Sequence, residues 1–360
     1  MRKVRSGSRI AAQSLALALV SALTVACGNS SDPGSSDLPE LAYFEGAAGA
    51  PVLNRIVLVR ADGEGRRVLW EDPAGNVLYQ SPQFTPNGDA LLYYREANLP
   101  PAPPESGWWI VPVDGGQPQP FIAPVGARPR FAPVGNLVAW AGSDWLGIAP
   151  RGSSTVVRII PDTMRLAGFD WSPDGTRIVV SLYSDLQPDQ NLFLVSPSGG
   201  DLVPLAPSDP SITSWEFKPM WSPDGSLIAY VKDAPSLETD GGGLWVTAPD
   251  GSGNRRLSTG LNSDLPVAWM TGGREILVVR QSQGLPNVRG LLDVETGEFR
   301  ELDVPGSLVE RPLSSDGQFL LLASRSPINE PAVVVTDADG GGRKQMHSDA
   351  FMGMLPVWRP

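Results

Sequence analysis

One stretch decides the fold expected of this chain, namely Phe169-Asp170-Trp171-Ser172-Pro173-Asp174-Gly175-Thr176-Arg177-Ile178-Val179-Val180. The pattern returns fifty residues later as Pro219-Met220-Trp221-Ser222-Pro223-Asp224-Gly225-Ser226-Leu227-Ile228-Ala229-Tyr230. Each copy contains an aromatic residue, a four-residue turn and a β-rich run. Ser-Pro-Asp-Gly suits a type I turn, because Ser favours its first position, Pro presets φ at the second and Gly suits the fourth. A long unit that returns at this interval indicates a repeat architecture.

We call the residue that precedes each turn the anchor. Related anchors recur along the chain in units of about 40–50 residues, and they are Phe84, Phe131, Trp171, Trp221, Trp269, Leu313 and Trp358. From Leu41 onward no window shows sustained helical periodicity, and short β-branched and aromatic runs bounded by Gly, Pro and Asp recur instead. We expect most anchors to be packing residues between units.

Each unit contains four short predicted strands, which is the signature of a β-propeller blade. The sequence therefore predicts an all-β fold, a seven-bladed β-propeller of four-stranded antiparallel blades. Leu41–Phe44 is a predicted second strand with no anchor before it, whereas Pro356–Pro360 is an anchor with no second strand after it. A propeller ring must close to cover the faces of its end blades. We therefore expect the N- and C-terminal segments to pair in one composite blade.

The first residues read as a targeting segment followed by a tether. A basic head at residues 2–9 precedes a short apolar run, Leu15–Leu23, so residues 1–26 are a predicted lipoprotein signal peptide. Leu23-Thr24-Val25-Ala26-Cys27 resembles the lipobox of bacterial lipoproteins, in which the cysteine is lipidated after cleavage. An ordinary secretory signal with a chance cysteine is the alternative. Residues 27–40 are a predicted flexible tether and residues 41–360 the propeller, with the outer membrane favoured as the site of anchoring.

Charge argues against a nucleic-acid partner. Removal of residues 1–26 would leave 24 basic and 39 acidic residues, a net charge of −15. Phosphate neutralisation requires clustered Lys and Arg, and the sequence contains no such cluster.

The repeats resemble those of the TolB-type propeller family, a WD-repeat-like family of periplasmic and secreted bacterial proteins. The resemblance rests on the Trp-Ser-Pro-Asp-Gly motifs at residues 171–175 and 221–225, on Ile228-Ala229-Tyr230 and on turns such as Asp337-Ala338-Asp339-Gly340. It implies a β-propeller and an exported protein, and it carries little information on function. TolB itself has an additional N-terminal α/β domain and six blades, so its partnership is not transferred.

Residue types that carry catalysis or bind metals are scarce. A nucleophile-elbow motif does not occur, and His347 and Cys27 are the only histidine and cysteine. We predict no catalytic residues, no metal site and no cofactor. Asp337–Gly340 resembles the start of a calcium loop, but we expect a hairpin turn there. Asp170 and Asp174 could act as an acid–base pair, but their place in the repeat favours turn capping.

Irregular segments beside aromatic residues are better candidates for binding. The longest, Glu96–Gly107, is rich in proline and leads into Trp108 and Trp109, and a second contains Trp215 and Phe217. We take these four aromatic residues as a possible binding-loop set. The alternative for Trp108 and Trp109 is that they are ordinary strand residues, one facing each side of the sheet.

Three functions remain open from the sequence. The leading hypothesis is a membrane-tethered, non-enzymatic scaffold that binds another cell-envelope protein or peptide. The second is a propeller enzyme, a lyase or hydrolase that acts on a glycan or peptide in the central channel. The third is a small-ligand or calcium sensor.

Overall fold

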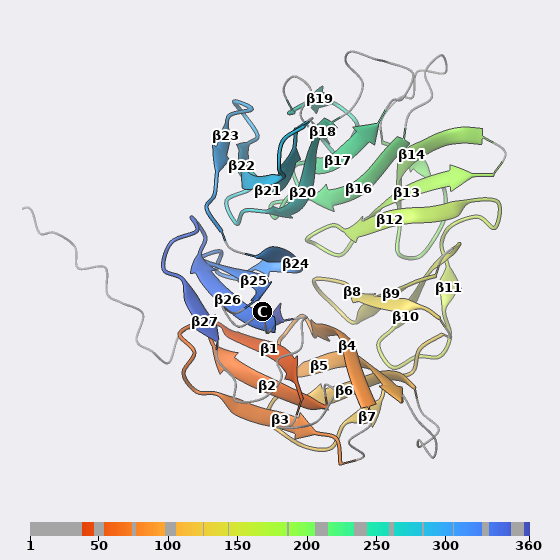
Figure 1. Cartoon of the computed structure of the whole chain (residues 1–360). Coiled ribbons are helices and arrows are strands. Elements are labelled where there is room, and N and C mark those ends of the chain that lie inside the picture. Colours follow the sequence, from red (N-terminus) through yellow and green to blue (C-terminus); the bar gives the residue numbers. More distant parts are fainter. Residues whose placement is uncertain are drawn as a thin grey trace, which may run out of the picture. The chain divides into compact units, whose positions relative to one another are not determined.

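The residues that the computed structural model describes form β-strands joined by turns (Figure 1). The described residues are 38–46, 54–73, 77–97, 106–124, 126–142, 144–185, 187–205, 215–233, 243–258, 263–282, 284–304, 306–325, 331–346 and 356–360. The predicted signal peptide, Cys27 and most of the predicted tether lie outside this set. Among the described residues, no helix combines the length and hydrophobicity needed to cross a membrane.

Five of the sheets have four antiparallel strands each, as expected for propeller blades. The first contains β28 (Val357–Trp358), β1 (Glu40–Glu45), β2 (Arg55–Arg60) and β3 (Arg67–Glu71). The second contains β4 (Val77–Phe84), β5 (Ala90–Ala97), β6 (Gly107–Pro112) and β7 (Gln119–Pro120). The third contains β8 (Arg128–Phe131), β9 (Leu137–Ala141), β10 (Leu146–Pro150) and β11 (Val157–Arg158). The other two are β20 (Ser263–Trp269), β21 (Glu275–Gln281), β22 (Val288–Asp293) and β23 (Phe299–Glu301), and β24 (Ser307–Leu313), β25 (Phe319–Arg325), β26 (Pro331–Asp337) and β27 (Lys344–Met346).

The remaining strands form one eight-stranded sheet. It contains β12 (Arg165–Trp171), β13 (Ile178–Ser184), β14 (Gln187–Val195), β15 (Val203–Pro204), β16 (Trp215–Trp221), β17 (Ile228–Asp233), β18 (Gly243–Thr247) and β19 (Arg255–Arg256). Antiparallel runs from β12 to β15 and from β16 to β19 are joined by a parallel bridge between Gln190 of β14 and Trp215 of β16.

The prediction of seven separate four-stranded blades is therefore wrong. The propeller has five four-stranded blades, and the two sequence repeats that carry the clearest Trp-Ser-Pro-Asp-Gly motifs lie in the larger sheet. Polar contacts account for the merger. The carbonyl of Glu216 accepts hydrogen bonds from the Ser181 hydroxyl at 2.5 Å and from the side-chain amide of Gln190 at 3.1 Å. These bonds hold the start of β16 against β13 and β14, where packing alone was expected.

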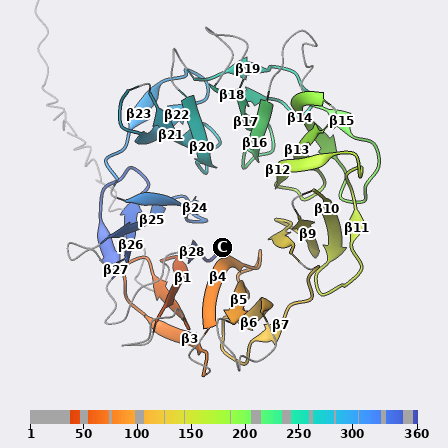
Figure 2. The same ribbon diagram turned by 45° about the vertical axis from the view of Figure 1, so that its right-hand side comes forward.

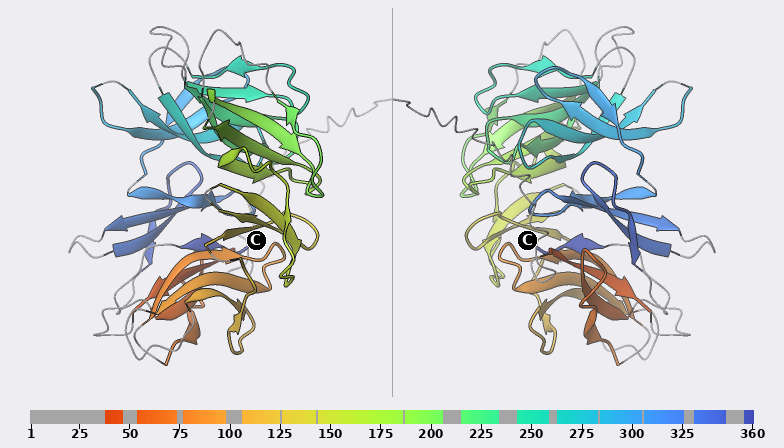
Figure 3. Two further views of the ribbon diagram at one scale, coloured as in Figure 1. Left: turned by 90° about the vertical axis from the view of Figure 1, so that its right-hand side faces the viewer. Right: turned by 90° about the vertical axis from the view of Figure 1, so that its left-hand side faces the viewer.

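The predicted pairing of the terminal segments is confirmed. β28 pairs with β1 in antiparallel register, with Leu41 opposite Trp358 and Ala42 opposite Val357. Figures 1 and 3 place the C-terminal end beside the orange strands of the first sheet. The backbone N–H of Arg359 donates to the carbonyl of Glu40 at 2.8 Å, which extends the pairing by one residue.

Hydrophobic side chains between neighbouring sheets form the core, and the sheets surround a common centre (Figure 2). Between the first and second sheets, Phe44, Tyr79 and Tyr93 are buried and pack edge to face, with ring centroids 4.9 to 6.3 Å apart. This is the preferred geometry of aromatic pairs. Burial of one such side chain contributes roughly 1.5–3 kcal/mol.

The aromatic anchors are buried packing residues, as predicted. The indole N–H groups of Trp171, Trp269 and Trp358 also donate hydrogen bonds to backbone carbonyls, and the acceptors are Arg130 at 3.3 Å, Met220 at 3.2 Å and Pro312 at 2.8 Å. Each acceptor is the residue immediately before the preceding anchor. The sequence repeat thus produces the same hydrogen bond between strands that carry successive anchors.

Candidate functional site

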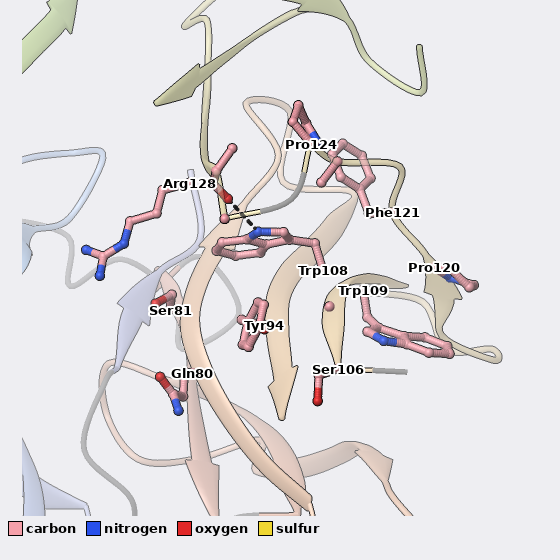
Figure 4. Close-up of a pocket in the computed structure, with 14 residues that line it drawn as sticks. Gln80, Ser81, Tyr94, Ser106, Trp108, Trp109, Pro120, Phe121, Pro124 and Arg128 are labelled. Atoms are coloured by element: carbon pink, nitrogen blue, oxygen red, sulfur yellow. Dashed lines mark hydrogen bonds between the residues drawn. The ribbon is translucent and has the colours of Figure 1, made fainter. Parts of the chain in front are cut away.

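A first cavity, the tryptophan pocket, has a volume of about 580 Å³ and lies beside β6 (Figure 4). Its walls come from β4 to β8 and their connections, and its principal lining residues are Gln80, Ser81, Tyr94, Trp108, Trp109, Phe121, Pro124 and Arg128. Four aromatic side chains and two prolines contribute to the lining beside small and polar residues, and Arg128 is the only charged residue among the described lining residues. The pocket therefore suits an apolar or aromatic group.

Trp108 has a fixed orientation in this pocket. Its indole N–H donates to the carbonyl of Ala127 at 2.9 Å, and its ring meets Tyr94 edge to face with centroids 5.5 Å apart. Figure 4 shows the Arg128 side chain extending to one side of Trp108 and Trp109 on the other. A half-buried ring whose polar edge is already satisfied can receive a ligand by packing alone.

Trp108 and Trp109 face opposite sides of β6, because side chains alternate along a strand. Trp108 packs on the cluster that contains Trp140, whereas Trp109 packs on the cluster that contains Tyr93. Both are therefore strand residues, which is the alternative that the sequence left open. Both also line the tryptophan pocket.

A second cavity of about 630 Å³, the arginine pocket, adjoins the first. The two share Ser81, Trp108 and Arg128. Its walls are β4, β8, β24 and the C-terminal residues 356–360. Its charged lining residues are Arg128, Arg130, Glu310, Arg311 and Arg359. Among the described lining side chains, four guanidinium groups face one carboxylate, so positive side chains predominate here in a chain whose net charge is −11.

Two of these arginines are held by partners. Arg130 donates to the carbonyl of Phe169 at 2.8 Å and to Asp170 at 3.3 Å. Arg359 donates to the carbonyl of Gly88 at 2.9 Å and to Glu40 at 2.5 Å. These bonds fix the two side chains and offset part of their charge.

Arg128 and Arg311 differ from Arg130 and Arg359 in their exposure and in their hydrogen bonding. Both are exposed, and within the described ranges neither side chain makes a hydrogen bond or ion pair. The walls of the pocket reduce the solvation of Arg311, and together with the nearby charge of Arg130 this lowers the pKa of Arg311 to about 10. A pKa of about 10 lies well above neutral pH, so the Arg311 guanidinium remains a cation there.

Bulges in β4 and β24 shape the walls of the two pockets. β4 loses its register between Gln80 and Gln83, so that Ser81 and Pro82 stand out of the ladder, and β24 loses its register between Leu308 and Leu313. Ser81 has a φ of 49°, which is strained for a residue that precedes proline. Bulges commonly redirect side chains at binding sites. Here the bulge in β24 contains Glu310 and Arg311.

The other two aromatic residues of the predicted binding-loop set lie elsewhere. Trp215 and Phe217 are on β16, where Trp215 is 41% exposed and Phe217 is half-buried. Neither lines the tryptophan pocket or the arginine pocket. The structure therefore does not bring the four aromatic residues together. Residues 98–105 of the proline-rich segment lie outside the described residues.

The carboxylates considered for acid–base chemistry have structural partners. Asp170 accepts a hydrogen bond from the backbone N–H of Trp221 at 3.0 Å, besides its contact with Arg130. Asp174 accepts the Ser172 hydroxyl at 2.5 Å and the N–H of Thr176 at 3.0 Å, which is turn capping as predicted.

The other motifs are placed as follows. Asp337–Gly340 forms the hairpin turn between β26 and β27, as predicted, with Gly340 N–H donating to Asp337 O at 2.9 Å. No group of three His, Cys, Asp or Glu side chains suited to a metal ion occurs among the described residues. His347 lies outside them.

The sequence analysis did not identify these four arginines as a group, because they are not clustered along the chain. The four arginines come together only in the folded structure, around one cavity. A signal was present, since Arg128, Arg130, Arg311 and Arg359 all lie within three residues of an anchor. The segments next to the anchors form inner strands, so basic residues at these positions converge.

No protein-family model and no curated protein sequence matches this chain. An oligogalacturonate lyase solved in complex with manganese has a similar structure, with a TM-score of 0.61, 16% identity and coverage of 85% of each chain. A puromycin hydrolase has a TM-score of 0.60 and 18% identity over 87% of this chain and 52% of the hydrolase, so the chain spans about half the hydrolase's length. TolB from Acinetobacter baumannii has a TM-score of 0.49 and 17% identity over 89% of this chain and 67% of TolB. At these identities the lyase and the hydrolase show a shared fold alone, and that fold is the β-propeller.

Proposed function

We propose that this protein is an exported, lipid-anchored, non-enzymatic binding protein of the bacterial cell envelope. It would hold a peptide segment of another envelope protein in the tryptophan and arginine pockets. The observation that carries the proposal is that Trp108 and Arg128 line both pockets. They present an aromatic surface and a cation side by side. Arginine at neutral pH binds anions and does not exchange protons, which suits binding better than acid–base catalysis.

Export and anchoring rest on the sequence of residues 1–27. The basic head, the apolar run and the lipobox-like end support cleavage before Cys27 and lipidation of that residue. A Cys27→Ser variant is expected to leave the membrane fraction, and continued membrane attachment would refute the anchor.

Photo-crosslinking in cells tests the binding proposal. A photoreactive amino acid replaces Ser315, an exposed residue that lines the arginine pocket. We expect one discrete crosslinked product, because a seated peptide lies within reach of this position. The matched control is Leu285, which is 67% exposed and lines neither pocket.

Variants of two tryptophans sharpen this test. Trp108→Ala removes the aromatic surface that lines both pockets and is expected to abolish the crosslink. Trp215→Ala, on β16, is expected to leave the crosslink intact. Equal products at Ser315 and Leu285, or no product at Ser315, would overturn the proposal.

A propeller enzyme is the second candidate. The observation that favours it is a cation-lined pocket in a fold shared with an oligogalacturonate lyase. Turnover of oligogalacturonate by the purified protein, lost in Arg311→Gln, would replace the binding proposal with this one.

A further inference from the structure

We propose that the arginine pocket recognises carboxylate side chains of an acidic peptide, with Arg128 and Arg311 as the binding residues and the tryptophan pocket receiving a neighbouring apolar or aromatic side chain. This inference rests on the proposed function and specifies its ligand.

Charge is the first step of the argument. The chain is acidic, with 39 acidic against 28 basic residues, yet the described side chains that line this one cavity include four arginines and one carboxylate, Glu310. Cavities lined by one sign of charge concentrate ligands of the opposite sign. An acidic ligand is repelled by the protein as a whole and attracted to this place.

The second step concerns which arginines are available. Arg130 and Arg359 form ion pairs with Asp170 and Glu40, so part of each guanidinium is already occupied. The side chains of Arg128 and Arg311 have no such partner in the described part of the chain. A guanidinium matches a carboxylate with two parallel hydrogen bonds, a stronger and more directional contact than a lysine provides.

Rigid supports hold both groups in place. Arg128 begins β8, which pairs with β9 through residues 128–131. Arg311 stands on the bulge of β24, whose flanking residues Leu308 and Leu313 pair with β25. The two side chains therefore approach the cavity from different sheets, and an acidic segment between them would contact both.

The lining of the tryptophan pocket favours a peptide over an acidic glycan as the ligand. A uronate oligosaccharide carries a carboxylate on every sugar, so it would place negative charge in the tryptophan pocket as well. Among the described residues that line that pocket, Arg128 is the only charged one, and this arginine is shared with the arginine pocket. A peptide can instead place an acidic side chain in one pocket and an aromatic one in the next.

A display experiment on the full chain tests the inference. Purified protein is used to select from a library of random heptapeptides, and the enriched sequences are read. We expect enrichment of Asp and Glu one to three residues from an aromatic residue. Binding of the enriched peptides should weaken as salt rises, because the contact is electrostatic.

Single variants locate the contact. Arg128→Gln and Arg311→Gln should each weaken binding of an enriched peptide about tenfold, as expected for a charge-assisted hydrogen bond. Both residues are exposed, so each variant protein should have the same melting temperature as the unmodified protein. Arg300→Gln on β23 is the control, because Arg300 is about half exposed and lines neither pocket.

The outcomes separate the two proposals. Enriched peptides without acidic residues, or peptides whose binding is unaffected by Arg128→Gln and Arg311→Gln, would overturn this inference and leave the binding function intact. Binding of oligogalacturonate with no peptide selected would overturn it in favour of a glycan. A library from which no peptide binds would overturn the proposed function itself.

Discussion

Anchor tryptophans act at the level of single residues, through burial and through one hydrogen bond each. Trp171, Trp269 and Trp358 donate to the carbonyl that precedes the previous anchor. Trp221 departs from this rule. Its indole nitrogen is buried without a hydrogen-bond partner in the described residues, and its ring lies under Arg177, whose guanidinium carbon is 5.0 Å from the ring centroid.

This difference gives a matched pair of substitutions. Trp269→Phe and Trp221→Phe remove similar volumes from positions that are 6% and 5% exposed. Only Trp269→Phe also removes the donor to the Met220 carbonyl, so it should lower the free energy of unfolding by about 1 kcal/mol more than Trp221→Phe. Urea denaturation followed by tryptophan fluorescence measures the difference, and equal losses would show that the hydrogen bond contributes nothing.

Turns are the elements that the sequence specifies most strongly. In the copies at Ser172, Ser222 and Ser314 the serine hydroxyl donates to the aspartate two residues later, at 2.5 to 2.6 Å. The same hydroxyl accepts the N–H of the residue five positions on, at 2.9 to 3.0 Å. The glycine that follows has a φ near 70° in each copy, a conformation that few other residues adopt.

The turns also predict a pH dependence. The Ser172 hydroxyl and the backbone N–H of Thr176 lower the pKa of Asp174 to about 2, from an ordinary value of 3.8. A lowered folded-state pKa contributes stability that is present above the unfolded pKa and is lost as pH falls through the folded one. Asp174→Asn should therefore lower the melting temperature by about 2 °C at pH 7 and by less as pH approaches 2.

Scanning calorimetry of the two proteins between pH 7 and pH 2 checks this expectation. Asp201→Asn, at an exposed carboxylate between β14 and β15, serves as the control. A deficit for Asp174→Asn that stays constant across this range would contradict it.

Ring closure is a property of the whole molecule. The last residues contact three separate sheets: Trp358 pairs with Leu41 of β1 and donates to Pro312 of β24, and Arg359 donates to Gly88 in the turn after β4. Sheets far apart in the sequence are thereby joined through five residues of chain. The same residues form one wall of the arginine pocket, so closure and the proposed binding site are coupled.

Loss of this closure should be costly. Trp358 is 6% exposed, and Trp358→Ala is expected to reduce stability by about 3–5 kcal/mol, because it removes a buried indole and leaves a cavity. Deletion of residues 356–360 should have a larger effect, since it also removes the strand pairing. Thermal unfolding measures both, and an unchanged melting temperature in the deletion would rule out a structural role for β28.

Much of the architecture was predictable because the repeat encodes it locally. Turn residues, anchor aromatics and β-branched runs act over a dozen residues, so the four-stranded unit and the pairing of the terminal segments followed from them. The merger of β12–β19 into one sheet did not. It depends on Gln190, Ser181 and Glu216, polar residues that lie outside the repeat motif and meet only after folding.

The sequence by itself determined the β-propeller class, the turns and the packing role of the anchors, because short-range backbone preferences and alternating burial carry that information. Only the tertiary structure decided the sheet count and the site. Trp215 and Phe217 stay apart from Trp108 because they belong to another sheet, and arginines at positions 128, 130, 311 and 359 meet because the inner strands converge. The grouping of these side chains depends on how the sheets pack against one another, and the repeat motif specifies that packing only in part.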